Sequence, residues 1–384
     1  MDSRVALGFA IAWVMGVAFL NVPAALDPLM ALYAASYTRI SLLMSALFWT
    51  HALVQIPSGV LVDRLGLKRN LIACLGAMTL GSLLPLAGAS LELAVAGRIL
   101  TGVGTGLSFP TVFKMIALCS PRNKIGMHQA FFGGFFSLGC IAAYLVIPQL
   151  VPLGWIWVYL APGLGFLPLL AWAVFLRVEG RPAVATTAAE FLGVFRVRAA
   201  WAIGLYHSLS WGSVLALGSW VPSLLAEASG SGASAPFAWG GMLVLLVSGI
   251  GRLSGGMLLF RLPPGPIAHG SIAVLAGLYG ALFLAEDPRA LLPLALTAAA
   301  SASINFGAFF HLISRAGPAG SLGTLIGLVN MIANFGAVAF TFLFGWFKDT
   351  RGSFTDGFLV LGAVCLLAVG LGRRLLSARG AAVR

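Results

Sequence analysis

Long apolar stretches alternate with short polar turns along almost the whole chain. A transmembrane helix needs about 20 mainly apolar residues to cross the hydrocarbon core of a bilayer. Turns rich in proline and glycine separate most of the stretches. The pattern therefore predicts an all-α integral membrane protein with twelve transmembrane helices. The expected spans are 5–26, 40–62, 70–89, 93–117, 127–149, 154–176, 199–224, 237–260, 266–285, 290–312, 321–345 and 355–375.

The first half of the sequence returns in the second half at a constant offset of 197 residues. The pattern Gly-x-Leu-x-x-Arg occurs at 59–64 and again at 256–261, and the same offset aligns Phe109 with Phe306. Because six spans restore the original sidedness, the two halves repeat in parallel orientation. We expect two pseudo-symmetric six-helix bundles. Their bounds are 1–176 for the N-terminal bundle, 177–198 for a cytoplasmic linker and 199–384 for the C-terminal bundle.

The composition supports a membrane protein and explains the positive charge. The chain is 60% hydrophobic and only 9% charged, whereas a soluble domain carries about 25% charged residues. The net charge is +12. If both termini lie on one side, most of the 23 lysines and arginines fall on that side, which the positive-inside rule makes the cytoplasm. The charge therefore reflects topology, and we expect no nucleic-acid partner.

Two motifs carry a resemblance to a known family. The first lies in the turn between the second and third spans, and the second lies on the fourth span. Their residues are Gly59, Leu61, Asp63, Arg64, Gly66, Lys68 and Leu71, followed by Arg98-x-x-x-Gly102-x-Gly104-x-Gly106. In these residues the chain resembles a bacterial twelve-helix transporter of the major facilitator superfamily. Leu67 departs from the family pattern, because an arginine is usual at that position.

The resemblance implies a monomer that crosses the bacterial inner membrane twelve times and works by alternating access. It also implies a gating role for the first motif. Asp63 resembles an aspartate that locks the two halves together in the outward-open state, with Arg64, Gly59 and Lys68 in the same turn. The alternative is a solvated turn that serves as a topology signal. On the fourth span, Arg98 either holds a structural network with backbone carbonyls or influences proton movement.

A charged side chain inside a span is costly, so Arg252 is a candidate for substrate binding. It lies four residues before Gly256, and Gln55 lies four residues before Gly59, so the two occupy equivalent positions. The segment around Arg252 resembles nitrate/nitrite porters, in which symmetric arginines hold the anion. Gln55 replaces one of that pair, which argues against nitrate itself. One guanidinium can still bind a carboxylate in bidentate fashion, or it stabilises the bundle.

Other polar residues inside the spans are weaker candidates for the same site. Lys114 and His311 occupy equivalent positions and favour an anion if both face one cavity, although Lys114 can instead reach the cytoplasmic interface. His207 can couple a proton or form a local hydrogen bond. Asn330 and Asn334 share a helix face and either line the cavity or bridge helices. Six glycines are expected to allow close helix packing: Gly102, Gly104, Gly106, Gly133, Gly134 and Gly139.

The missing features narrow the function. The fifth span lacks the Gly-Pro pair of drug/proton antiporters, and acidic residues are nearly absent from the spans. No phosphate-binding loop, metal cluster or nucleophile triad is readable, so we expect neither an enzyme nor a cofactor or metal. We expect a secondary active transporter that moves a small organic or inorganic anion with proton coupling. The alternatives are an efflux pump for drugs or metabolites and a non-transporting sensor or scaffold.

Overall fold

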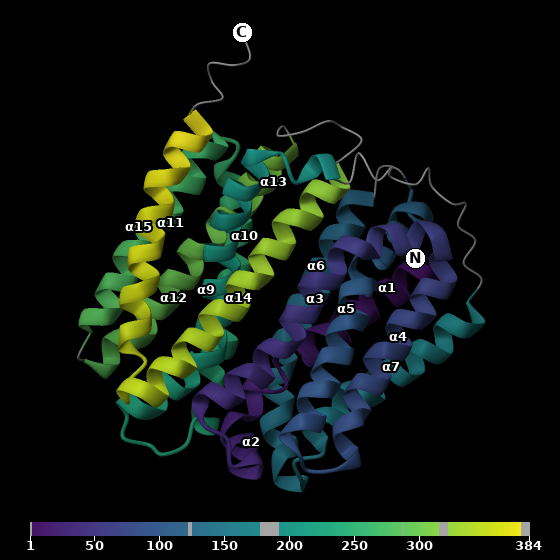
Figure 1. Ribbon diagram of the computed structural model, residues 1–384, viewed down its shortest axis with the longest axis horizontal. Helices are drawn as coiled ribbons and strands as arrows, with labels where there is room; N and C mark the ends of the chain where they lie inside the picture. The colour runs from purple at the N-terminus through teal and green to yellow at the C-terminus, as the bar shows by residue number, and fades with distance from the viewer. Residues whose placement is uncertain (1, 122–124, 177–191, 286, 315–321, 378–384) are drawn as a thin grey trace. The chain divides into compact units, whose positions relative to one another are not determined.

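The computed structural model describes residues 2–121, 125–176, 192–285, 287–314 and 322–377. These residues form helices and turns, and no strand occurs among them. Contacts divide the chain into two compact units, Met1–Ala185 and Thr186–Arg384, which we describe separately. Unit 1 runs from purple to blue in Figure 1, and unit 2 from teal to yellow.

Unit 1 consists of long helices whose starts are set by polar caps. Asp2, Ser36 and Ser90 each precede a helix and accept a hydrogen bond from a backbone N–H of its first turn. Gly66 separates two helices at φ +78°, a conformation that glycine adopts without steric strain. The helices are α1 (Ser3–Leu20), α2 (Leu26–Tyr33), α3 (Tyr37–Leu65), α4 (Leu67–Leu83), α5 (Leu91–Cys119), α6 (Ile125–Leu150) and α7 (Trp157–Phe175).

Unit 2 repeats this organisation with one interruption. Asn305 separates two helices that together occupy the place of one expected span, 290–312. The helices are α9 (Arg198–Ala228), α10 (Ala238–Leu258), α11 (Pro264–Leu284), α12 (Pro288–Ile304), α13 (Phe306–Ser314), α14 (Leu322–Arg351) and α15 (Thr355–Ser377).

The observed helices coincide with the expected spans. Eleven described helical segments are long and apolar enough to cross a membrane, with α12 and α13 counted as one. The helix at the place of the second expected span is α3, which has 29 residues and contains the polar residues His51 and Gln55. At 1.5 Å per residue its length is about 44 Å, which exceeds the hydrocarbon thickness. The first span is shorter than expected, because α1 ends at Leu20 and a separate turn begins at Pro23.

Glycines bring helices together in unit 1 at some of the expected positions. A side chain at Gly139 of α6 would overlap the carbonyl oxygen of Trp13 on α1, so these two backbones touch. Gly102 of α5 lies in the same way against α3. The expectation is wrong for Gly133 and Gly134, because nothing lies within 4 Å of a Cβ built at either residue.

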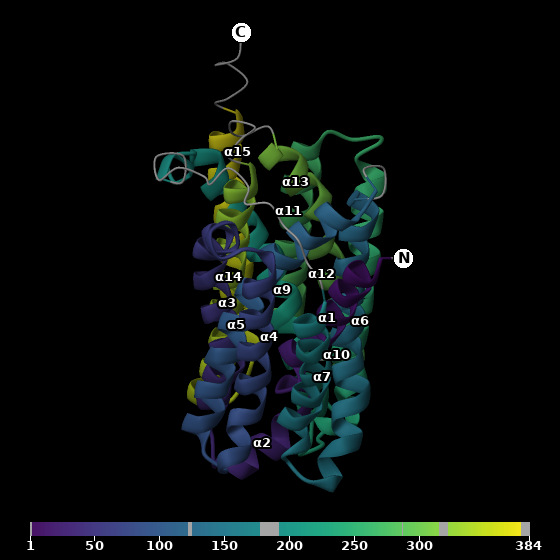
Figure 2. The same cartoon turned by 90° about the vertical axis from the view of Figure 1, so that its right-hand side faces the viewer.

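In unit 2, α9 and α14 pack extensively against each other (Figures 1 and 2). Trp220 of α9 is fully buried and donates its indole N–H to the carbonyl of Thr341 at 3.0 Å. Toward the C-terminal end of α14, Lys348 pairs with Glu227 of α9 at 2.9 Å. A hydrogen bond inside the bundle and an ion pair at its end therefore fix the two helices in register.

Candidate functional site

Arg98 forms the most extensive polar contact of unit 1. Its side chain is buried, and its guanidinium donates to the carbonyls of Ala18, Phe19 and Met44 and to Oδ1 of Asn21, the last three at 3.3, 3.3 and 3.0 Å. Two of these carbonyls end α1, where the last turn has no intrahelical donors. The positive charge of Arg98 also lies at the negative C-terminal end of the α1 dipole, where a cation is favoured. This geometry ties α5 to α1 and α3.

Asn21 extends the same network to a fourth helix. Its side-chain amide donates to the carbonyl of Val158 on α7 at 2.9 Å, while its oxygen accepts from Arg98. Both functional groups of the Asn21 amide are therefore used in holding helices together. The contacts of Arg98 and Asn21 therefore join α1, α3, α5 and α7 in one hydrogen-bonded network.

A second polar chain in unit 1 holds Gln55. The Gln55 amide lies 3.0 Å from Nε2 of His51, and Nδ1 of His51 lies 3.0 Å from the hydroxyl of Thr105 on α5. Thr105 in turn donates to the carbonyl of Gly102. We therefore assign Nδ1–H of His51 as the donor to Thr105 and Nε2 as the acceptor from Gln55. These bonds fix the Gln55 side chain on α3.

The candidate anion anchor of unit 2 is Arg252, which lies between two aromatic rings. Its guanidinium carbon is 5.1 Å from the ring centre of Trp211 and 4.7 Å from that of Phe306. The Trp211 indole N–H donates to Oδ1 of Asn334 at 3.3 Å, and the Asn334 amide donates to the carbonyl of Asn330 at 2.9 Å. The cation–π contacts thus place the charge of Arg252 within a cluster held by α9, α10, α13 and α14.

His207 belongs to the same cluster. Its ring centre lies 5.8 Å from that of Phe306 and 5.5 Å from that of Phe309. His207 also lies close enough to Arg252 to interact with it electrostatically. The structure therefore brings together four of the residues that the sequence suggested. We call this set, Arg252, His207, Asn330 and Asn334 with the walls Trp211 and Phe306, the arginine cluster.

The remaining candidates belong to both units. Gln55 and Lys114 belong to unit 1, and Lys114 is half-buried on α5, one residue after Phe113. Phe113 stacks on Phe109 with ring centres 4.7 Å apart. His311 is half-buried on the short helix α13.

The gating motif lies at the junction of α3 and α4. Gly59 is in the last third of α3, and Lys68 is in the first turn of α4. The side chains of Asp63 and Arg64 lie outside the described part of the structure. Gly66 forms the turn between the helices, as its place in the motif suggests.

Sequence reasoning missed several contacts of buried polar residues. Asn305, at the break between α12 and α13, donates to Ser271 and accepts from Ser210, both at 2.9 Å. The hydroxyl oxygen of Tyr206 on α9 lies 2.6 Å from Nδ1 of His269 on α11. A polar residue inside an apolar span was the available signal, but the partner on another helix cannot be read from one sequence.

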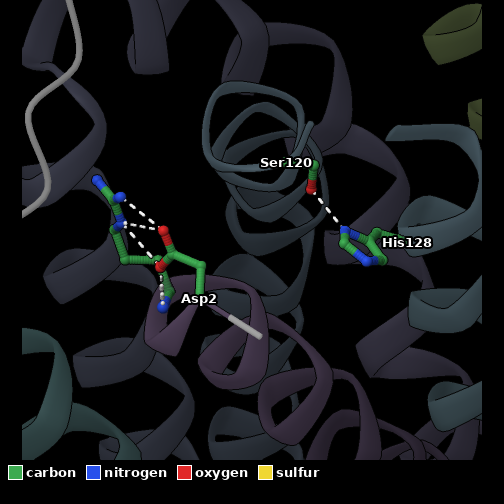
Figure 3. Close-up of polar contacts among 4 residues, drawn as sticks. Asp2, Ser120 and His128 are labelled. Carbon is green, nitrogen blue, oxygen red and sulfur yellow. Dashed lines mark hydrogen bonds and ion pairs between the residues drawn. The ribbon is translucent and has the colours of Figure 1, made fainter. Parts of the chain in front are cut away.

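Two further polar pairs are shown in Figure 3, one at the start of α1 and one between α5 and α6. Arg4 forms an ion pair with Asp2 at 2.6 Å, and this hydrogen bond lowers the pKa of Asp2 from its usual value. The Ser120 hydroxyl lies 2.7 Å from Nδ1 of His128. These contacts fix helix ends and contain none of the residues expected to bind substrate.

Eleven described segments that are long and apolar enough to cross a bilayer define a multi-pass membrane protein. The sequence profile of the Major Facilitator Superfamily matches residues 6–341. The chain therefore belongs to this superfamily.

Individual relatives agree with the family. The uncharacterised transporter YybO of Bacillus subtilis is 23% identical over 86% of this chain and 84% of its own length. An uncharacterised MFS-type transporter of Mycobacterium tuberculosis and the probable anion transporter 6, chloroplastic, of Arabidopsis thaliana are each 28% identical. They match 38% and 34% of this chain. The chain spans only about a quarter of the length of these last two relatives, 27% and 26%.

Solved structures show the same fold. A bacterial homologue of the human lysosomal transporter Spinster, in an inward-facing and occupied conformation, superposes with a TM-score of 0.76 over 98% of this chain and 97% of its own, at 15% identity. The fucose:proton symporter of E. coli superposes with a TM-score of 0.66 over 97% and 98% of the two chains, at 17% identity. At these identities the comparison concerns the fold alone.

Proposed function

We propose that the protein is a secondary active transporter of a small anionic solute, with a carboxylate as the expected anionic group. The arginine cluster carries this proposal. Arg252 supplies a fixed positive charge inside the membrane, and cation–π contacts of about 0.5–2 kcal/mol hold it. A bidentate carboxylate is a stronger partner for a guanidinium than an aromatic ring is. An anion can therefore bind Arg252 without the cluster having to unfold.

Proton coupling fits the same cluster. His207 interacts electrostatically with Arg252. A bound anion offsets the repulsion between Arg252 and a protonated His207, so each ligand favours the binding of the other. We infer that one proton accompanies the anion during alternating access. The similarity to a probable anion transporter supports an anionic substrate. The distribution of lysine and arginine supports a cytoplasmic location of both termini, and the resemblance to bacterial twelve-helix transporters supports the bacterial inner membrane.

The test is anion uptake into proteoliposomes with and without an inward proton gradient. Arg252→Gln places in unit 2 the residue that unit 1 has at the equivalent Gln55 position. We expect this variant to fold, as checked by thermal unfolding, and to lose uptake of the carboxylate substrate. The exposed residue Arg289 in the first turn of α12 offers a matched control, and Arg289→Gln should transport normally.

His207→Gln separates coupling from binding. We expect it to keep anion exchange across the membrane, which needs no net proton movement, and to lose the acceleration by the proton gradient. Uptake of cationic or neutral amphiphiles that Arg252→Gln leaves unchanged would overturn the anion proposal and favour efflux of drugs or metabolites. This second candidate function, efflux, is supported by the aromatic rings of Trp211 and Phe306 beside Arg252, which can also contact an amphiphile.

A further inference from the structure

A groove outside the arginine cluster runs between α3 and α5 of unit 1. Its volume is about 390 Å³. Its apolar walls include Leu42 and Trp49 from α3 and Ile99 from α5, which are 49, 44 and 43% exposed. The groove is therefore open on the surface of the molecule, and α3 and α5 lie side by side there (Figure 1).

The groove opens where the two helices diverge. A side chain at Gly102 of α5 would overlap Thr50 of α3, so the backbones are in close contact at that level. Leu91 and Val95 of α5 and Ala46 of α3 line the groove on the side of the helix starts. The lining positions on each helix are three to four residues apart, so they form one continuous stripe per helix.

The polar residues in the lining offer almost nothing to a ligand. Ser45 donates to the carbonyl of Leu42, and Thr50 donates to the carbonyl of Ala46, within the same helix. The groove surface is consequently apolar over most of its length. The exception is Arg39, which lies in the first turn of α3 at one end of the groove.

Arg39 is exposed, and its side chain forms no ion pair with an acidic residue of the described part of the chain. Among the described residues, no ion pair or hydrogen bond of its guanidinium is present, and only its backbone N–H bonds to Ser36. Two basic residues at the C-terminal end of α14 do have acidic partners, namely Lys348 with Glu227 and Arg351 with Asp356. The positive end of the α3 dipole adds to the field at Arg39.

The length of the groove matches one leaflet of a bilayer. Arg39 and Trp49 are ten residues apart, which at 1.5 Å per residue corresponds to about 15 Å along α3. Half of the hydrocarbon core is also about 15 Å thick. A ligand in this groove has an anionic group at the membrane surface and an apolar chain that reaches the bilayer centre.

We propose that the groove between α3 and α5 binds one anionic glycerophospholipid, with its phosphate on Arg39 and an acyl chain along Leu42, Trp49 and Ile99. The apolar walls accept any acyl chain, and Arg39 gives the preference for a negative headgroup. One basic residue at a membrane surface gives a preference of about fivefold for an anionic lipid. This site is independent of the transported solute.

The test is native mass spectrometry of the full-length protein with phosphatidylglycerol or phosphatidylcholine of equal chain length. We expect the wild type to carry phosphatidylglycerol about fivefold more often than phosphatidylcholine, and Arg39→Gln to bind the two lipids equally. Arg289→Gln is the matched control, because Arg289 is an exposed arginine in the first turn of α12 that does not line the groove. It should keep the wild-type preference.

A second variant tests the groove itself. Val95→Trp fills the space between the helices, so we expect it to reduce retention of both lipids, with thermal unfolding as the check of folding. The proposal is overturned if Arg39→Gln keeps the headgroup preference or if Val95→Trp binds both lipids as the wild type does. Displacement of the lipid by millimolar inorganic phosphate would also overturn it, because the site would then be a plain anion site.

Discussion

Replacing Arg98 by methionine tests the buried network at the end of α1. Methionine has a similar length but donates no hydrogen bond, so the change leaves four oxygens without their donor. They belong to Ala18, Phe19, Met44 and Asn21. All four belong to residues of unit 1, and Ala18, Phe19 and Asn21 are buried.

The size of the effect follows from the number of bonds. Hydrogen bonds between helices in membranes average about 0.6 kcal/mol, so four of them give about 2.4 kcal/mol. Removing one partner of a buried charged network costs about 3–5 kcal/mol in soluble proteins, which gives an upper bound. We therefore expect Arg98→Met to lower the free energy of unfolding by about 2–5 kcal/mol. For 384 residues at about 2.1 cal/mol/K each, the corresponding decrease in Tm is about 2–6 °C.

Thermal unfolding of the purified protein in detergent, followed by circular dichroism, measures this change. Arg69→Met is the control, because Arg69 is exposed on α4 and its loss should change stability by less than about 0.5 kcal/mol. Arg98→Lys should fall between the two, since one ammonium reaches fewer of the oxygens. A wild-type Tm for Arg98→Met, combined with lost proton coupling, would refute the structural role and favour the proton-linked one.

Two matched pairs of variants test the packing of the helices by the same unfolding measurement. Gly139→Ala should lower stability by about 1–3 kcal/mol, because its methyl group overlaps the Trp13 carbonyl and forces α1 and α6 apart. Gly133→Ala, in open space on the same helix, should be neutral or stabilising; equal losses in both variants would contradict the packing. Lys348→Met should cost up to about 1 kcal/mol, because the Glu227 pair is partly exposed. Arg351→Met should cost less, since its 3.9 Å pair is longer and more exposed; the reverse order would argue against a contribution from the Lys348 pair.

The sequence predicts the helices well because their length and apolar character are imposed by the membrane. It predicts their faces poorly, because a span is apolar toward both lipid and protein. Gly133 and Gly139 illustrate this limit: both looked like packing glycines, yet only Gly139 touches another helix. The break at Asn305 was also missed, since no proline marks it and Gly307, two residues later, is one of many glycines inside the spans.

The candidate site is subject to the same limit. An intramembrane charge is visible in the sequence, so Arg252 and His207 could be selected, and the structure places them in one cluster. Arg252 and Trp211 are 41 positions apart in the chain and lie on different helices, so the spacing of residues within one helix does not predict their contact. The periodicity of one helix carries no information about which residue of another helix it meets.

Arg98, which is buried, and Arg252, which is half-buried, differ in the described contacts of their guanidinium groups. Arg98 donates to four oxygen atoms, so an anion that bound to it would have to replace hydrogen bonds that also hold α1, α3 and α5. Arg252 lies against the rings of Trp211 and Phe306, whose attraction for a cation is weaker than that of a carboxylate. A substrate anion can thus bind Arg252 at a small cost in packing, whereas binding to Arg98 would loosen the bundle. In the sequence, both residues are simply arginines inside expected spans. Their contacts support our proposal that Arg98 stabilises the fold and that Arg252 binds the transported anion.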